Sequence, residues 1–390
     1  MGTVLRVGRS QRKDAREAAQ EAASAALEGA DAPVVALVFA TWQYDVDALA
    51  AGLASRLDGL PWAGCTTVAA FAEDALIEHG VVVGVIDSPG ARAGVGVGEA
   101  VGEGERAAGA AAVAAALSDM PLTPADRSRL LLVFPDTTRG NAAEVVRGAV
   151  AEGGAGVVWA GGGSGDNLGR SRAVQLAEGR VRRDCVVVVA VDLPSRVGAG
   201  VQHGWQPYGP SAMVTRASGV VAEELEYRSA FDVYRDAAVA RGMTVDEASF
   251  TSFAMMHPLG IPQAGQEYLI RDPVSIEPGG GLRCVGEVPD GALVRFMRAE
   301  HDAVVEAAGR AAALAREGLR GGITGALVFD CVSRYLILGD AFGDELAAYR
   351  GSLGPAVPMI GCLTYGEVGA FGDRVPQFHN KTSVVVAIPA

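Results

Sequence analysis

Small and polar residues gather where three apolar segments of the chain end, at residues 64–67, 161–167 and 361–367. Glycine lets a ligand approach the main chain closely, and the hydroxyl groups, Asp166, Asn167 and Glu367 offer directional hydrogen bonds. Ligands of open α/β sheets bind beyond the carboxyl ends of parallel strands. These clusters therefore predict a pocket for a small polar molecule, for instance one that carries an ammonium and a carboxylate group.

The histidines and cysteines leave two further kinds of chemistry open. His379 or His203 could serve as the axial ligand of a non-covalent haem. Cys362 could act as a nucleophile with His379 as its base, although a reactive thiol needs a lowered pKa and buried cysteines are usually inert. The five cysteines form no CxxC pair and the histidines form no HExxH motif, so neither a disulfide framework nor a metal site is predicted.

Composition excludes several classes of protein. The formal net charge is −13, which argues against a nucleic-acid partner, and 49% hydrophobic with 20% charged residues excludes a disordered chain. The glycine run at 161–165 lacks the Gly-Lys-Ser/Thr of a phosphate-binding loop. No apolar run approaches the roughly 20 residues of a membrane helix, and no signal peptide is evident, so a cytoplasmic location without membrane insertion is expected. Only Lys13 and Lys381 are lysines, a bias that we attribute to a GC-rich genome.

A unit of strand, helix, strand and closing strand occurs three times along the chain. Its length suits a crossover between parallel strands, and continuous Val and Ile runs suit strands that are covered on both faces. We expect an α/β or α+β fold with mixed sheets and two domains built from these strand–helix–strand units. The landmarks of the unit are Phe39, Phe134 and Phe329 in the first strand and Gly64, Gly161 and Gly361 in the second.

Gly- and Pro-rich residues interrupt this pattern near the middle of the chain. We expect an N-terminal helical extension at 1–29, a first domain at 30–200, a connecting segment at 201–220 and a second domain at 221–390. A hairpin is predicted around Ser218-Gly219, and helices are predicted at 45–57, 142–152, 231–241 and 344–351, with a long Ala-rich helix ending near residue 315.

Several motifs make the chain resemble the FIST family, the sensory domain of prokaryotic signalling proteins. They are Pro-Trp-Ala-Gly-Cys-Thr-Thr at 61–67, Ala-Gly-Gly-Gly-Ser-Gly-Asp at 160–166, His-Gly-Trp-Gln-Pro at 203–207, His-Pro-Leu-Gly-Ile at 257–261, Thr-Tyr-Gly-Glu at 364–367 and Phe-His-Asn-Lys-Thr at 378–382. The resemblance spans paired N- and C-terminal FIST domains. The first motif departs from the family pattern at residues 68–70, where Val-Ala-Ala replaces Ala-Gly-Glu.

The resemblance implies a bacterial sensor that binds an amino acid or similar metabolite without catalysis and signals to a protein on a separate chain. Some relatives bind haem and sense nitric oxide, which keeps haem as the alternative cofactor. A homodimer is possible. The ligand-binding residues that the family motifs and the strand-end clusters imply are Gly361, Cys362, Thr364, Tyr365, Glu367, His379, Asn380, Asp166 and Asn167.

Overall fold

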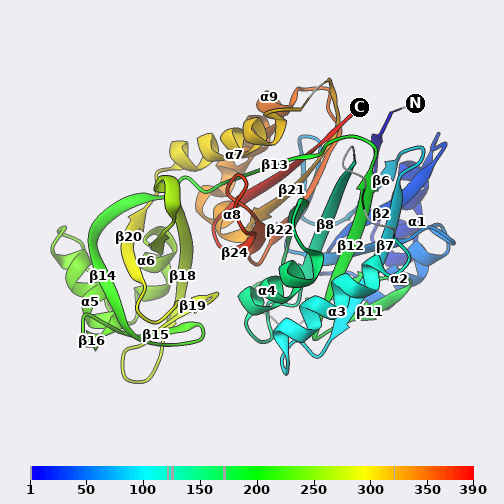
Figure 1. Cartoon of the computed structure of the whole chain (residues 1–390). Coiled ribbons are helices and arrows are strands. Elements are labelled where there is room, and N and C mark those ends of the chain that lie inside the picture. Colours follow the sequence, from blue (N-terminus) through cyan, green and yellow to red (C-terminus); the bar gives the residue numbers. More distant parts are fainter. Residues whose placement is uncertain (1, 121–122, 124–126, 170–172, 320) are drawn as a thin grey trace.

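The protein consists of a body of three β-sheets and a smaller lobe built on a fourth sheet (Figure 1). The computed structural model describes residues 2–120, 123, 127–169, 173–319 and 321–390. The lobe, residues 206–298, is inserted between strand β13 (Gly198–Gln202) and helix α7 (His301–Arg316) of the body. The fold is α+β with mixed sheets, as expected.

The first sheet of the body has the order β1-β6-β2-β3-β10-β11. Strands β2 and β3 are parallel, as the crossover length predicts, and the closing strand β6 runs antiparallel beside β2. The bounds are β1 Val4–Ser10, β2 Pro33–Thr41, β3 Trp62–Thr67, β6 Val81–Asp87, β10 Gln175–Ala177 and β11 Arg180–Arg182.

The other two sheets repeat this pairing pattern, with parallel pairs β8–β9 and β21–β22 and antiparallel closing strands β12 and β25. The second sheet contains β7 Arg92–Glu99, β8 Ser128–Pro135, β9 Val157–Gly162, β12 Cys185–Leu193, β23 Glu367–Gly369 and β24 Gln377–His379.

 The strand order of this sheet is β24-β23-β9-β8-β12-β7, so β23 lies between β24 and β9. The third sheet adds β21 Ile323–Cys331, β22 Met359–Thr364, β25 Ser383–Pro389, β4 Ala70–Ala72 and β5 Ala75–Ile77 to β13.

Each sheet of the body is completed by a short strand from a neighbouring unit. Strand β10, which follows β9 in the chain, pairs with β3; β23, which follows β22, pairs with β9; and β4, which follows β3, pairs with β22. The three units are therefore interlocked in a ring. The exchange covers the edges of β3, β9 and β22 and leaves the three-residue strands β11, β24 and β5 at that side of the sheets.

The inner faces of the three sheets share one hydrophobic core. At its centre the rings of Phe39, Phe134 and Phe329 form a near-equilateral triangle, with centroid separations of 6.2, 5.9 and 5.9 Å. Edge-on and tilted arrangements of this kind are favourable for aromatic rings. The three landmark phenylalanines therefore mark a pseudo-threefold axis.

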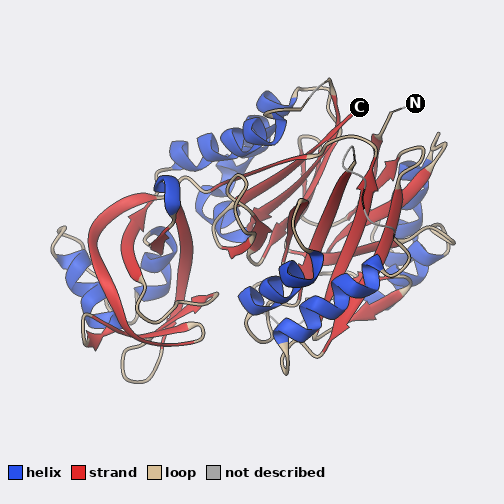
Figure 2. Cartoon of the chain, viewed as in Figure 1, coloured by secondary structure: helices blue, strands red, loops and turns tan. Residues whose placement is uncertain are grey.

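Helices cover the outer face of each sheet (Figure 2). Their Ala-rich faces pack on the Val and Ile side chains of the strands, which explains why those strands are apolar on both faces. The pairs are α1 Ala15–Leu27 with α2 Val46–Ala54, α3 Glu105–Leu117 with α4 Ala142–Gly153, and α7 with α9 Phe342–Leu353, beside the short α8 Val332–Leu338.

The lobe has its own hydrophobic core. It contains the predicted hairpin, in which β14 and β15 pair on either side of Ser218-Gly219. Its elements are β14 Gln206–Ser218, β15 Val221–Leu225, β16 Arg228–Ser229, α5 Ala230–Val239, α6 Phe250–Met256, β17 Leu259–Pro262, β18 Tyr268–Ile276, β19 Leu282–Val285 and β20 Leu293–Arg298.

The N-terminal segment contains more than the helix expected from the sequence. Strand β1 precedes α1 and pairs along its length with β6, so this segment is an integral part of the first sheet. The polar residues 11–14, which separate β1 from α1, give no indication that the preceding segment pairs with β6. Within the described ranges, no helix is long and apolar enough to cross a membrane.

Candidate functional site

The chain leaves the body for the lobe through a tight turn at His203, Gly204 and Trp205. Gly204 has a φ of +89°, and a Cβ there would lie 2.5 Å from the Ala303 carbonyl oxygen, so the turn requires glycine. The main-chain N–H of Trp205 donates to His203 Nδ1 at 2.9 Å. The turn therefore fixes both aromatic side chains at the boundary between lobe and body.

Arg334 on α8 holds this turn beside the segment that precedes β25. Its Nη1 donates to the carbonyl oxygen of His203 at 2.7 Å and to that of Lys381 at 3.3 Å. The guanidinium is fully buried and forms ion pairs with Asp330 and Glu345. Two stretches of chain that are far apart in the sequence thus lie side by side at one end of the third sheet.

The protonation of the two neighbouring histidines follows from their contacts. Burial lowers the pKa of His203 to about 3 and that of His379 to about 4, so both imidazoles are neutral near pH 7. His203 Nδ1 accepts a hydrogen bond, which places its proton on Nε2. His379 Nε2 donates to the Gly369 carbonyl oxygen at 3.0 Å, which leaves Nδ1 as an acceptor.

Several polar atoms of this region are buried without a hydrogen-bond partner among the described residues. Their side chains are at most 5% exposed. Buried polar atoms are almost always paired, so a group of unpaired ones points to a water or a ligand that completes them. The atoms are the donors His203 Nε2 and Trp205 Nε1 and the acceptors His379 Nδ1 and Asn380 Oδ1.

A buried cation lies beside these atoms. Lys381 Nζ is 3.0 Å from Asp272 Oδ2 on β18 of the lobe and 5.6 Å from the centroid of the Trp205 ring. Asp272 also accepts a hydrogen bond from Ser333, which in turn accepts one from the Cys331 thiol. Lys381 has a left-handed φ of +55°, an unfavourable conformation for a residue with a Cβ. The contact between lobe and body therefore includes buried polar and charged groups, beside the apolar side chains of Ile270 and Met297.

Glu367 at the start of β23 is fully buried beside the same region. Its two carboxyl oxygens accept hydrogen bonds from the Thr364 hydroxyl at 2.8 Å and the Thr382 N–H at 3.2 Å. Burial nevertheless raises the pKa of Glu367 to about 8, because these bonds only partly offset the loss of solvation. The side chain is therefore mainly protonated at neutral pH.

Tyr365 and Asp166 meet at the end of the neighbouring strands. The Tyr365 hydroxyl lies 2.9 Å from Asp166 Oδ1 and accepts a hydrogen bond from the Leu168 N–H at 2.8 Å. Asn167, by contrast, is exposed and caps its own turn through Gly169 N–H. The predicted site residues thus fall into a Tyr365–Asp166 group and a group around His379, with Asn167 outside both.

Gly361 and Cys362 lie in the middle of β22 and face packed side chains. A Cβ at position 361 would lie 2.2 Å from the Phe71 ring, so this glycine serves the packing of β4 against β22. Burial raises the pKa of the Cys362 thiol well above its ordinary value, and Cys65 lies beside it. A nucleophilic cysteine needs the opposite shift, so the geometry lends the thiol-enzyme alternative no support.

The haem alternative meets an obstacle at Phe371. Its ring centroid lies 6.3 Å from that of His203 and 4.9 Å from that of His379, so it packs against both imidazoles. Phe371 therefore occupies the space next to both candidate axial ligands. Among the described residues, no group of three His, Cys, Asp or Glu side chains could hold a metal ion.

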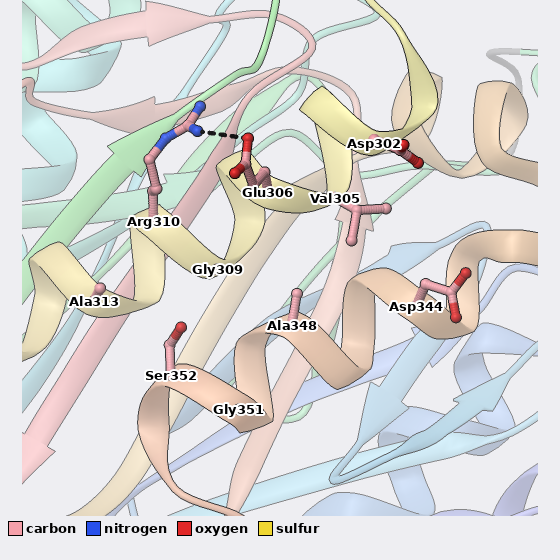
Figure 3. Close-up of a pocket in the computed structure, with 10 residues that line it drawn as sticks. All are labelled: Asp302, Val305, Glu306, Gly309, Arg310, Ala313, Asp344, Ala348, Gly351 and Ser352. Atoms are coloured by element: carbon pink, nitrogen blue, oxygen red, sulfur yellow. Dashed lines mark hydrogen bonds and ion pairs between the residues drawn. The ribbon is translucent and has the colours of Figure 1, made fainter.

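A surface groove of about 600 Å³ lies elsewhere, between α7 and α9 (Figure 3). Its floor is formed by small residues such as Gly309 and Gly351, and no side-chain or main-chain atom lies within 4 Å of a Cβ built at Gly351. Helices α3 and α4 pack more tightly, since a Cβ at Gly148 would lie 2.0 Å from Arg106 O. The groove contains none of the predicted ligand-binding residues.

Sequence reasoning missed Lys381, Trp205 and Asp272 as site residues. Two signals were available: Lys381 is one of only two lysines, and Trp205 adjoins a histidine in a Gly-rich turn. The pairing of Lys381 with Asp272 had no local signal, because it joins the end of the chain to the inserted lobe.

Family models match most of the chain. The FIST N domain matches residues 34–228, and the FIST C domain matches residues 230–370. The chain belongs to the FIST family. The boundary between the two FIST domains falls within the lobe, after the predicted hairpin. FIST domains are sensory domains, so the chain carries a paired sensory domain.

Two solved structures show a distant similarity to this FIST protein. The crystal structure of cyanuric acid hydrolase from A. caulinodans is 10% identical, with a TM-score of 0.34 and coverage of 100% of both chains. T. maritima PurL complexed with ADP is 10% identical, with a TM-score of 0.22 over 99% of this chain and 71% of that one. With TM-scores this low, neither likeness bears on function. No curated protein matches the chain.

Proposed function

We propose that this FIST protein binds an amino acid or a similar small polar metabolite where the lobe meets the body, and that it signals to a protein on a separate chain. The observation that carries the proposal is the group of four buried polar atoms without partners on His203, Trp205, His379 and Asn380. Two are donors and two are acceptors, which suits a ligand that carries both kinds of group. Membership of a sensory family supports the same role.

The contacts between lobe and body suggest how binding would be transmitted. Arg271 on β18 donates to the Phe378 carbonyl oxygen at 3.2 Å, and Asp272 pairs with Lys381. A ligand that contacts residues 379–381 would change these contacts directly. The lobe would then shift relative to the body, and a separate partner would recognise the new arrangement. We place this event in the cytoplasm, because all five cysteines are free thiols and form no disulfide.

Thermal unfolding in the presence of amino acids and hydroxy acids tests the proposal. A ligand that binds only the folded state stabilises it by about 3 kcal/mol at a hundred times its Kd, which raises the melting temperature measurably. His379→Phe should abolish that rise. His257→Phe, at a histidine that stacks on Phe253 within the lobe, is the matched control and should retain it. If no compound at millimolar concentration raises the melting temperature, the proposed function is wrong.

A further inference from the structure

Two of the unpaired atoms at the junction are donors in fixed directions. His203 Nε2 carries the imidazole proton, because Nδ1 accepts from the Trp205 main chain. The main chain of Tyr268 on β18 interacts with this imidazole and acts to raise the pKa of His203, but Nε2 has no partner at full hydrogen-bond geometry among the described residues. Trp205 Nε1 can only donate. Both therefore call for an acceptor that the described residues do not supply.

Lys381 adds a charged donor at the same place. Its Nζ lies over the Trp205 ring, and Arg334 holds the main chains of Lys381 and His203 together through a single nitrogen. Apart from its ion pair with Asp272, Nζ has no hydrogen-bond partner among the described residues. An ammonium has three N–H groups, so further donors are available to a ligand.

A second buried cation lies on the lobe side of the junction. Arg271 is fully buried and donates to the carbonyl oxygens of Glu287, Ile270 and Phe378. No carboxylate of the described residues lies at ion-pair distance from it; the Glu287 carboxylate acts on Arg271 but forms its ion pair with Arg147. Buried cations favour an anionic group beside them, and Lys381 has only Asp272 as its ion-pair partner among the described residues.

We propose that His203 Nε2, Trp205 Nε1 and Lys381 Nζ bind the carboxylate of the ligand. A carboxylate accepts several hydrogen bonds, and its negative charge is attracted by the Lys381 ammonium. His379 Nδ1 and Asn380 Oδ1 then remain for the ligand's own N–H or O–H groups. This inference rests on the proposed function and narrows the ligand to small carboxylic acids.

Acetate and acetamide are matched probes for this site, because they have the same shape and only acetate is charged. The protein is labelled with 5-fluorotryptophan, and the ¹⁹F signal of Trp205 is identified by its loss in Trp205→Phe. If that variant does not fold, the same signal is found by elimination with variants of the other tryptophans, Trp42, Trp62 and Trp159. We expect a saturable shift of the Trp205 signal with sodium acetate and none with acetamide or with sodium chloride at equal ionic strength.

His203→Phe removes one donor and should weaken acetate binding about tenfold or more, the effect of one lost hydrogen bond to a charged group. His257→Phe should leave it unchanged. Equal responses to acetate and acetamide, or no response at Trp205, would overturn the inference even if the thermal screen finds a ligand. A response to acetate alone with a silent amino-acid screen would uphold the carboxylate site and refute the amino-acid ligand.

Discussion

Glu367→Gln should remove a pH dependence from the stability of the protein. In the folded state the pKa of Glu367 is raised to about 8 from its ordinary value of 4.5, so the folded state retains a proton that the unfolded state has lost. Stability therefore falls as the pH rises from about 4.5 through 8. The slope approaches about 1.4 kcal/mol per pH unit for one proton, which amounts to roughly 2 kcal/mol between pH 6.5 and 8.

That pH window separates Glu367 from the buried histidines. The pKa values of His203 and His379 are lowered from 6.5, so their contribution is present above pH 6.5 and is lost only as the pH falls towards 3–4. Urea unfolding at pH 6.5, 7, 7.5 and 8 gives the free energy of unfolding at each pH. The wild type should lose stability across the series relative to Glu367→Gln.

The substitution is structurally conservative because the second unit already has glutamine at this place. Gln175 pairs with Cys65 as Glu367 pairs with Gly162, and its amide donates to the Ser164 hydroxyl at 2.8 Å. The exposed residue Glu103 gives the control, since Glu103→Gln should follow the wild type. Parallel pH profiles for wild type and Glu367→Gln would refute the assignment of a protonated Glu367.

Four further outcomes follow from the packing. Phe329→Ala removes one ring of the central triangle and should lower the free energy of unfolding by roughly 3–5 kcal/mol in urea titration. Gly64→Ala should prevent soluble folding, because its Cβ would lie 1.7 Å from the Val38 carbonyl oxygen. Gly343→Ala, in open space on α9, should be neutral or stabilise the fold by up to about 1 kcal/mol. Soluble expression and the melting temperature distinguish the two variants. Arg334→Met leaves two buried carboxyl groups without their cation and should cost roughly 3–5 kcal/mol in the same titration. The five cysteine thiols are all buried, so a thiol reagent should react slowly with the native protein and with five equivalents in urea.

Local pattern predicted the elements of the body well. Continuous Val and Ile runs identified the central strands, and the predicted helix at 142–152 agrees with α4 to within a residue. The phenylalanines at 39, 134 and 329 were identified as equivalent, and they do occupy equivalent places around one axis. These features follow from side-chain periodicity within a few residues, which needs no knowledge of distant partners.

The strand that precedes the first helix of each unit, namely β1, β7 or β13, was not predicted from the sequence. Strand β7 is Gly-rich, because its glycines allow α3 to lie directly on the strand; a Cβ at Gly98 would be 1.8 Å from Ala108 O. Glycine normally weakens a strand pattern, so the segment carried no strand signal. The exchange of short strands between units was equally hidden, since three-residue strands show no periodicity of their own.

For the candidate site, the amino-acid sequence by itself determined the family and the parallel strand pairs and marked His379 and Asn380 as candidates, since each depends on residue types within a short motif. Only the tertiary structure decided that Trp205 and Lys381 join them and that the inserted lobe supplies Asp272. The physical reason is that an unpaired donor or a buried charge is defined by its surroundings. Those surroundings are assembled from three distant stretches of chain, and no single stretch encodes which polar atoms will lack a partner.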